Sequence, residues 1–358
     1  MFGVTPTRDE EQPIRDLIAQ LPDGWTADTP GPDDATELTG LLRRHEDFGR
    51  GWAGASEADL LVEISPRDDL TRENVVLRGP EGTIIGWCSA HDRAAGRMLL
   101  VTVVDRRLDD ETADRVATLL FSWADRVAEV VGRRRGLDVQ QIDSGAFAAD
   151  DRQHRWLERA GFTQVRTWWQ MTRPVEPGEA DLDAEAKPGV RIRPVERQGS
   201  GMPDEDDLRT VHEILESAFA DHFNTHEETF DEFLARLRED PGHRWDHWWI
   251  AELVDDGEPE PAGALVGAVS PGSGDAPDGS YVEYIGVLQN ARGRGVAKSL
   301  LNTVVADAAS RGRDRVGLEV DADSPTGADG LYVSMGWTTT YVTESWHHEV
   351  PVQPLPGR

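Results

Sequence analysis

The fold class is decided by the stretch Val282-Glu-Tyr-Ile-Gly-Val-Leu-Gln-Asn-Ala-Arg-Gly-Arg-Gly-Val-Ala-Lys-Ser-Leu-Leu301. Its first residues are mostly apolar or aromatic and predict a strand over 281–288. Two glycines then predict a turn, and apolar residues at helical spacing predict an amphipathic helix over 294–310. The apolar face of that helix consists of Leu300, Leu301, Val304, Val305 and Ala308. A strand, a short loop and a helix in direct succession indicate an α/β domain.

The loop before this helix has the residues of an anion-binding site. Glycine lets a ligand approach the backbone closely, and Gly293 and Gly295 lie where the helix begins. The unpaired N–H groups of a first helical turn point outward, and the helix dipole favours negative charge there. Arg292, Arg294 and Lys298 add positive charge in an otherwise acidic chain. The loop therefore predicts a site for a phosphate or pyrophosphate group.

Three phosphate-binding motifs must be distinguished at this loop. A P-loop requires Lys directly after its last Gly, whereas Val296 and Ala297 separate Gly295 from Lys298. A dinucleotide fingerprint requires a third glycine where this chain has Lys298, and it belongs near the first strand of its domain. The pattern Arg/Gln-x-x-Gly-x-Gly/Ala is matched by Arg292, Gly295 and Ala297. The sequence therefore favours the third motif.

The rest of the chain repeats one order of elements on either side of an acidic segment, rich in Pro and Gly, at 174–189. In the second half, strands are predicted over 191–195, 247–254, 262–270, 281–288, 316–321 and 338–350, and helices over 206–219, 228–238, 294–310 and 326–335. In the first half, strands are predicted over 74–78, 83–91, 98–105, 137–142 and 164–171, and helices over 35–45, 111–131 and 150–160. We therefore expect two copies of one α/β domain, at 1–173 and 190–358, joined by a linker at 174–189.

The composition of the 358-residue chain excludes several classes of function. Its net charge of −30 repels phosphate backbones and anionic membranes, so we expect no nucleic-acid or membrane partner. A field of this sign could attract cationic small molecules. The single cysteine, Cys88, excludes an intrachain disulfide framework and a zinc site built from cysteines. We expect a cytoplasmic protein, because neither a membrane span nor a secretory signal is visible.

The second half resembles a known family, the GNAT superfamily of N-acetyltransferases. The resemblance covers residues 191–350 and includes the strand that ends at Val287, the loop motif after it, and the run Asp323-Ser-Pro-Thr-Gly-Ala-Asp-Gly-Leu-Tyr-Val-Ser-Met-Gly-Trp337. That run is similar to the family's Asn-x-x-Ala-x-x-Leu-Tyr-x-x-x-Gly-Phe segment, with Ser324 replacing Asn and Trp337 replacing Phe. The two-copy layout is similar to tandem actinobacterial members of the mycothiol synthase type. The resemblance implies two tandem GNAT-like domains, each a mixed, mostly antiparallel sheet flanked by helices.

The resemblance also implies acetyl-CoA as the acyl donor and the primary amine of a small molecule as the acceptor, by direct attack on the thioester. Backbone groups of Ile285, Gly286 and Val287 would bond the pantetheine arm as an added strand would. The loop and the first helical turn would hold the pyrophosphate through main-chain N–H groups. These residues are Arg292, Gly293, Arg294, Gly295, Val296, Ala297 and Lys298. Ser324, at the asparagine position of the family, is a further candidate for cofactor binding.

Direct attack requires two proton transfers. A primary amine with a pKa of about 10 must lose a proton before it attacks. Glu283 lies at an even spacing from Val287 on one strand, so we expect both to point to one face, and Glu283 is the candidate general base. The leaving thiolate needs a proton, and Tyr332, at the tyrosine position of the family segment, is the candidate acid. The alternatives are a solvated strand residue for Glu283 and a core residue for Tyr332.

The first half departs from this pattern. After the predicted strand at 98–105, its loop reads Asp105-Arg-Arg-Leu-Asp-Asp-Glu-Thr112, without glycine and with acidic residues near the helix start. Those acidic side chains interact favourably with the positive end of the helix dipole, but their negative charge would repel a phosphate. Leu157 stands where the second copy has Tyr332. We therefore expect a degenerate, catalytically silent first domain that supports the second or shapes its acceptor site.

Other functions stay open. A non-catalytic acyl-CoA or small-molecule sensor would keep the loop at 292–298 without a working acceptor pocket. A protein N-terminal or lysine acetyltransferase would need an open groove. The mycothiol precursor is an acceptor that only the family resemblance suggests. The histidines show no metal-ligand spacing, so we expect no metal, and Asp221 and His222 are candidates to line the acceptor cleft. The sequence does not determine the acceptor, the acyl-chain preference or the oligomeric state.

Overall fold

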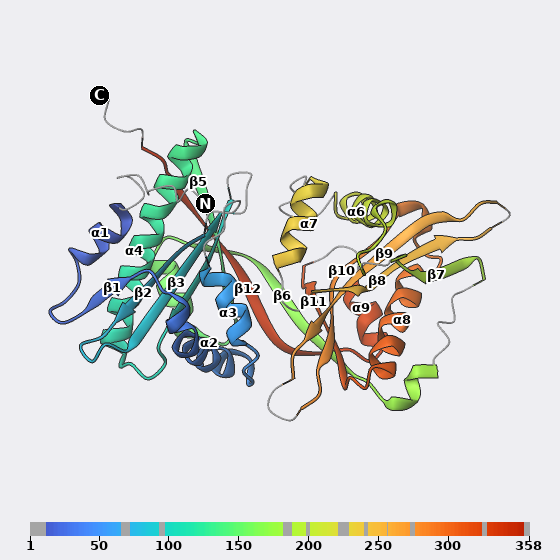
Figure 1. The fold of residues 1–358 in the computed structure, drawn as a ribbon, viewed down its shortest axis with the longest axis horizontal. Helices are drawn as coiled ribbons and strands as arrows, with labels where there is room; N and C mark the ends of the chain where they lie inside the picture. Colours follow the sequence, from blue (N-terminus) through green and yellow to red (C-terminus); the bar gives the residue numbers. More distant parts are fainter. Residues whose placement is uncertain are drawn as a thin grey trace. The chain divides into compact units, whose positions relative to one another are not determined.

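Two α/β units make up the chain in a computed structural model (Figure 1). The first unit contains the described residues up to Trp168 together with those from Tyr341 onward, and the second runs from Trp169 to Thr340. The structure describes residues 12–65, 72–92, 97–181, 188–197, 201–220, 229–239, 243–255, 257–272, 276–323 and 328–353.

The first unit is built on a mixed sheet with the strand order β1-β2-β3-β4-β5-β12. The pairs are antiparallel except for β4 and β5, which run parallel. The strands are β1 (Thr26–Asp28), β2 (Arg72–Arg78), β3 (Ile84–Asp92), β4 (Arg97–Val104), β5 (Val139–Phe147) and β12 (Thr338–Pro351). The helices are α1 (Gln12–Ile18), α2 (Ala35–Arg50), α3 (Glu57–Ile64), α4 (Asp110–Arg135) and α5 (Asp151–Arg159). Helices α4 and α5 bury their apolar faces in one core, and α2 and α3 bury theirs in another.

The second unit has the strand order β6-β11-β10-β9-β8-β7. Strands β10 and β11 run parallel, whereas β7 to β10 pair antiparallel with their neighbours. The strands are β6 (Thr163–Pro174), β7 (Val190–Pro194), β8 (His243–Leu253), β9 (Glu260–Ser270), β10 (Gly279–Val287) and β11 (Arg315–Asp321). The helices are α6 (Glu205–Phe219), α7 (Phe230–Glu239), α8 (Val296–Ser310) and α9 (Ala328–Ser334). The predicted fold class, with mixed and mostly antiparallel sheets, is confirmed.

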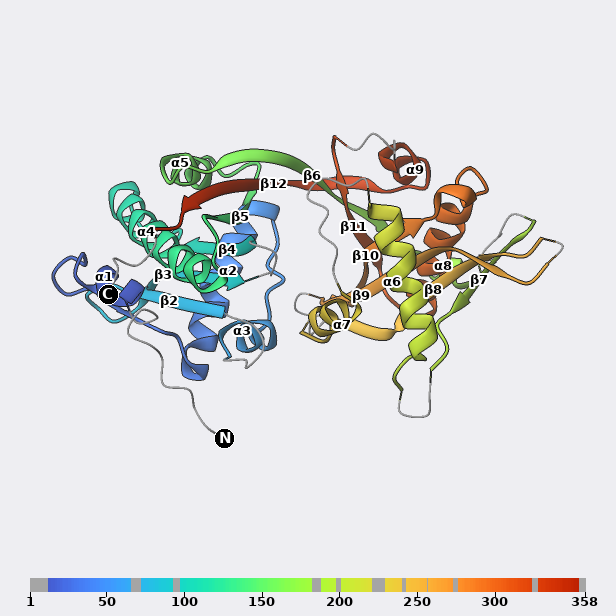
Figure 2. The same cartoon turned by 90° about the horizontal axis from the view of Figure 1, so that it is seen from above.

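Two hydrophobic cores lie on opposite sides of this second sheet. One core contains the apolar residues of α8, among them Leu300, Leu301 and Val304, together with Tyr332 of α9. The other contains the apolar residues of α6 and α7 with residues of β8 and β9. Figure 2 shows α6 over the strands β9 and β10. Helices α6 and α8 therefore pack on opposite faces of β10, the strand that decides the fold.

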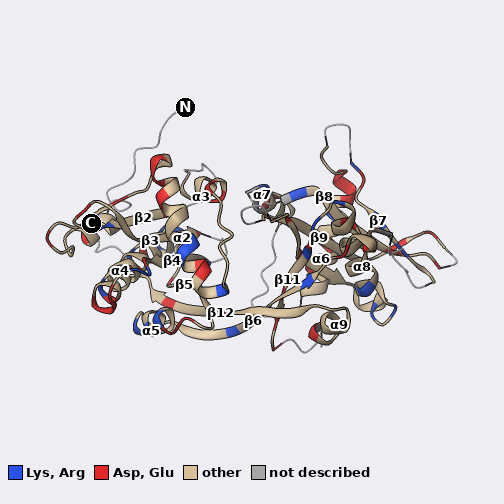
Figure 3. Ribbon diagram, turned by 90° about the horizontal axis from the view of Figure 1, so that it is seen from below, with Lys and Arg blue, Asp and Glu red and all other residues tan. Residues whose placement is uncertain are grey.

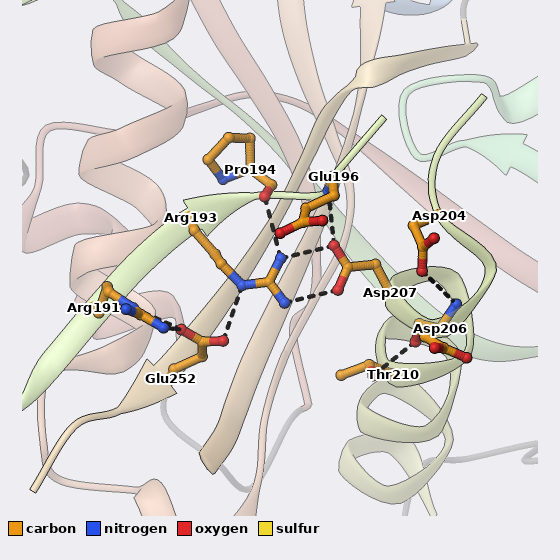
Figure 4. A network of polar contacts seen from close by, with 9 residues as sticks. All are labelled: Arg191, Arg193, Pro194, Glu196, Asp204, Asp206, Asp207, Thr210 and Glu252. Atoms are coloured by element: carbon orange, nitrogen blue, oxygen red, sulfur yellow. Dashed lines mark hydrogen bonds and ion pairs between the residues drawn. The ribbon is translucent and has the colours of Figure 1, made fainter. Parts of the chain in front are cut away.

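A network of charged residues fixes α6 on the sheet (Figure 4). Arg193 of β7 donates from both terminal nitrogens to the carboxylate of Asp207 on α6, at 2.7 Å each. Its Nε donates to Glu252 of β8 at 2.9 Å, and Arg191 pairs with the same glutamate. The pKa of Asp207 is lowered by its hydrogen bonds from Arg193 and the Glu196 backbone, although burial opposes the shift. One guanidinium thus ties α6 to two strands.

The boundaries of the units differ from the expected domains. Strand β6 begins in the first unit and ends in the second, whereas β12 begins in the second and ends in the first. The cause is strand pairing, since β12 pairs with β5 from Thr343 opposite Phe147 to Pro351 opposite Val139. The segment expected as a linker is also partly packed: Val175 is buried in the α8-side core, and its N–H donates to the Asp314 carbonyl at 2.8 Å.

Charges of both signs are spread along the ribbons of both units (Figure 3). The net charge of −30 is therefore not confined to one element. Within the described part of the chain, no helix combines the length and the apolar character needed to cross a membrane.

Candidate functional site

Strand β10 loses one neighbour halfway along its length. It pairs with β11 only over Ser280–Val282, opposite Val316–Leu318. It continues to pair with β9 as far as Val287 opposite Gly263. The last residues of β10, which include the predicted Ile285, Gly286 and Val287, thus have a strand partner on the β9 side and no β11 register on the other. Backbone groups along such an edge can receive an extended ligand as an added strand.

A β-bulge interrupts β10 at Glu283, where the register with β9 shifts between Val282 and Tyr284. Val282 and Val287 both pack in the α8-side core although they are an odd number of residues apart. The prediction that Glu283 and Val287 share a face assumed unbroken alternation, and the bulge makes that inference wrong. Glu283 is half-buried, with its Oε2 atom inaccessible to solvent. A bulge re-aims a side chain, so the local backbone rather than the spacing sets the direction of this carboxylate.

Helix α8 begins where the glycine loop predicted it. Gly293 and Gly295 adopt φ values of +75° and +85°, in the left-handed region that favours glycine. A Cβ at Gly293 would meet nothing within 4 Å. Among the described residues, none accepts a hydrogen bond from the backbone N–H of Gly295, Val296, Ala297 or Lys298. Four amides at a helix start, beside an open glycine, can together bind an anion.

The three cations of this loop have different surroundings. Arg294 donates to both carboxylate oxygens of Asp255, at 2.7 and 2.8 Å, and this pairing raises the pKa of the guanidinium. The side chains of Arg292 and Lys298 are exposed, and neither has a hydrogen bond or ion pair with another described residue. Asp255 thus engages the guanidinium fork of Arg294, while Arg292 and Lys298 stay available to a ligand.

Tyr332 lies in the core beside α8. Its side chain is 7% exposed and packs edge-on against Trp337, with 6.2 Å between the ring centroids. Burial raises the pKa of Tyr332 to about 12. A phenol with this pKa carries its proton at neutral pH, as a general acid must. A core residue would be buried in the same way, so this position is consistent with Tyr332 as a general acid and with Tyr332 as a core residue.

The corresponding loop of the first unit is closed by its own side chains. Asp109 caps α4 by accepting hydrogen bonds from the N–H and the hydroxyl of Thr112, at 3.0 and 2.8 Å. These hydrogen bonds lower the pKa of Asp109. Leu157, at the position of Tyr332, is fully buried in the core. A carboxylate therefore stands at this helix start in the first unit, where the second unit has free amides.

Sequence reasoning missed two neighbours of β10. Helix α6 covers Gly286, where a Cβ would lie 2.9 Å from the Ala218 Cβ and 3.1 Å from Leu215 Cδ2. The second missed neighbour is Glu319 of β11. It is exposed, although Leu318 and Val320 on either side of it are buried. A lone carboxylate within the apolar run Val316–Val320 was the signal that could have found it.

The candidates Ser324, Asp221 and His222 lie outside the described residues. Within the part of the chain that the structure describes, no three His, Cys, Asp or Glu side chains gather in a way that could hold a metal ion.

Comparisons with known proteins agree with this geometry. Residues 208–337 match the model of the acetyltransferase (GNAT) family. A mycothiol acetyltransferase of Frankia casuarinae is 30% identical over 94% of this chain and 95% of its own length. A second mycothiol acetyltransferase, from Kocuria rhizophila, is 30% identical over 62% of this chain and 68% of its own length.

Solved structures show the same fold over nearly the whole chain. A GCN5-related N-acetyltransferase from Sphaerobacter thermophilus has a TM-score of 0.72 at 24% identity, covering 94% of this chain and 99% of that protein. A tandem GNAT protein from the clavulanic acid biosynthesis pathway has a TM-score of 0.69 at 12% identity, covering 92% of this chain and all of that protein. The chain therefore belongs to the acetyltransferase (GNAT) family and is an acyltransferase that uses acetyl-CoA as its donor.

Proposed function

We propose that the second unit is an N-acetyltransferase that acts on the primary amine of a small molecule, by direct attack on acetyl-CoA. The observation that carries the proposal is the edge of β10 that β11 leaves unpaired, followed along the chain by the start of α8. The cytoplasm remains the proposed location.

The donor is proposed to bind along these two features. The pantetheine arm is an extended chain with amide groups, and Ile285, Gly286 and Val287 offer backbone partners to it. The pyrophosphate would accept hydrogen bonds from the amides of Gly293 and of residues 295–298, whereas the amide of Arg294 donates to the Ala291 carbonyl at 3.4 Å and would contribute through its side chain. The exposed Arg292 and Lys298 add charge there. Ser324 keeps its proposed place in this site.

The proposed chemistry moves two protons. The acceptor ammonium first gives a proton to Glu283, directly or through a water, and the free amine attacks the thioester carbon. The C–N bond forms as the carbonyl oxygen becomes an oxyanion, and the C–S bond then breaks. Tyr332 gives its proton to the departing sulfur, and the phenolate recovers a proton from the new amide nitrogen. Positioning of the amine and stabilisation of the oxyanion would supply most of the rate.

The first unit is proposed to be catalytically silent. Asp109 occupies the amide end of α4, and its charge would repel a pyrophosphate. Leu157 has no proton to donate where Tyr332 does. The role left to this unit is to support the second unit or to shape its acceptor site.

The first acceptor to test is the amine that corresponds to deacetylated mycothiol, since the relatives reported above carry the name mycothiol acetyltransferase. The experiment follows CoA release, with that amine and a panel of amino sugars, polyamines and aromatic amines. Turnover of at least one amine supports the proposal. Tight binding of acetyl-CoA without turnover of any amine would instead indicate a sensor. Acetylation of protein N-termini or lysines in an intact-mass assay, with all small amines inert, would favour a protein acetyltransferase.

A further inference from the structure

Two glutamates occupy the point where β10 and β11 separate. The last paired residues of these parallel strands are Val282 and Leu318. The residue that follows this last pair is Glu283 on β10 and Glu319 on β11. Paired strands lie about 4.8 Å apart, so the two backbones begin to diverge from about that distance. Both carboxylates therefore originate at the inner end of the unpaired edge of β10.

The side chain of Glu319 lies on the face of β11 that is turned away from α8. Val316, Leu318 and Val320 are buried in the α8-side core, so alternation places Gly317 and Glu319 on the opposite face. The ring of Tyr281 lies on that same face, because a Cβ at Gly317 would be 3.1 Å from its Cδ2 atom. Among the described residues, the core under α6 and α7 includes none from β11, so Glu319 is not part of that core.

The Glu319 carboxylate is reachable by solvent although protein surrounds it. The side chain is exposed, yet burial raises its pKa. The side-chain amide of Gln170 on β6 donates a hydrogen bond to its Oε2 atom. Gln170 is itself buried and its carbonyl accepts from Thr340, at 2.9 Å, so its backbone is anchored. One carboxylate oxygen is thus oriented by the amide of an anchored residue, while the residue as a whole is exposed to an incoming donor.

We infer that Glu319 is an acceptor-binding residue: its carboxylate receives the ammonium group of the substrate beside Glu283. This inference rests on the proposed function and deepens it. An ammonium offers three N–H donors, so it can bond to Glu319 with one while it gives the proton on another to Glu283. Gln170 acts as a positioning residue through its hydrogen bond to Glu319. Two carboxylates at one point disfavour an acceptor that carries its own carboxylate next to the amine, so the acceptor class is amines without a neighbouring acid group.

The test uses the full-length enzyme and the best amine from the CoA-release panel. Glu319→Gln keeps the size of the side chain and removes its charge. We expect the KM for the amine to rise about 10- to 100-fold, the range for loss of a charge-assisted hydrogen bond. The Kd for acetyl-CoA, measured by calorimetry, should not change. Glu319→Asp, which keeps the charge, should recover part of the KM, and Glu213→Gln on the exposed side of α6 is the matched control.

The salt dependence of the amine KM distinguishes a charge interaction with the substrate from a purely structural role of Glu319. Raising NaCl screens the attraction between ammonium and carboxylate, so the amine KM of the unmodified enzyme should rise with salt more steeply than that of Glu319→Gln. An unchanged amine KM in Glu319→Gln, or an equal loss of acetyl-CoA affinity, would overturn the inference while the proposed function stood. If the unmodified enzyme acetylates no amine at all, the proposed function fails and the inference falls with it.

Discussion

Arg294 and Asp255 form a two-point ion pair at the base of the glycine loop, with 2.7 and 2.8 Å between guanidinium nitrogens and carboxylate oxygens. Asp255 follows β8, and Arg294 stands two residues before α8. The pair lies against Gly189, where a Cβ would be 2.8 Å from Asp255 and 3.1 Å from Arg294. A carboxylate beside the proposed pyrophosphate site engages one of its cations, and this opposes binding of an anion.

Asp255→Asn should therefore strengthen acetyl-CoA binding. The change removes a negative charge and releases Arg294 toward the donor. Because Asp255 is exposed and the Arg294 side chain is partly exposed, we expect a gain of only about two- to fivefold in affinity at low salt, the range for surface ion pairs. Calorimetric titration at low and high NaCl measures it, and the gain should shrink as salt screens the charges. A weaker affinity in the variant would show that the pair supports the loop instead.

Gly295→Asp should abolish acetyl-CoA binding and turnover. The variant places a carboxylate at the amide end of α8, where the proposed diphosphate lies, and it also strains a backbone with φ +85°. Gly312→Asp is the matched control. Gly312 lies beyond the other end of the same helix, at φ +71°, with nothing within 4 Å of a Cβ, so it carries the same type of strain away from the site. Equal losses in both variants would count against the site.

The strand and the helix at the site could be predicted from the sequence because they depend on the local spacing of apolar residues and glycines. The predicted strand 281–288 and helix 294–310 correspond to β10 and α8 within two residues at each end. The elements that were missed, α1, β1 and α3, are short and lack a long periodic pattern. Local periodicity is weakest in short elements, where packing with distant parts decides the structure.

Features that depend on distant contacts were not accessible in the same way. The bulge at Glu283 arises from pairing with β9, and strict alternation on β10 cannot reveal it. Arg294 and Asp255 come from segments that only the folded sheet brings together. The pairing of β12 with β5 joins strands that lie about 200 residues apart in the sequence, as Thr343 opposite Phe147 shows, and an alternating strand carries no information about its partner. The expected domain boundary therefore missed the exchange of strands.

The unmodified chain should bind one molecule of acetyl-CoA. The second unit offers the unpaired edge of β10 and free amides at α8, whereas Asp109 caps the equivalent helix of the first unit. Calorimetric titration gives the stoichiometry directly. Binding of two equivalent molecules per chain, or a second molecule retained in Gly295→Asp, would contradict the proposal that the first unit is silent.

Tyr332→Phe should lower kcat far more than it lowers acetyl-CoA affinity. The variant keeps the ring that packs against Trp337 and removes only the hydroxyl that would protonate the leaving sulfur. Loss of a general acid costs about 100-fold or more in rate. Stopped-assay kcat values and calorimetric Kd values separate the two effects. An unchanged kcat would show that Tyr332 is a core residue and that another group near β10 protonates the leaving sulfur.

Tyr332 should also make the protein sensitive to alkali. Burial raises the pKa of its phenol to about 12, above its ordinary value near 10, so the folded state prefers the protonated form. The stabilisation is complete below pH ~10 and is lost as the pH rises toward ~12, by at most about 2–3 kcal/mol. Tyr332→Phe has no proton to lose at this position. Urea unfolding at pH 8 and pH 11 should therefore show a smaller loss of unfolding free energy in the variant than in the unmodified chain. The buried Cys88 thiol, whose pKa is also raised to about 12, is present in both proteins and cancels from this comparison.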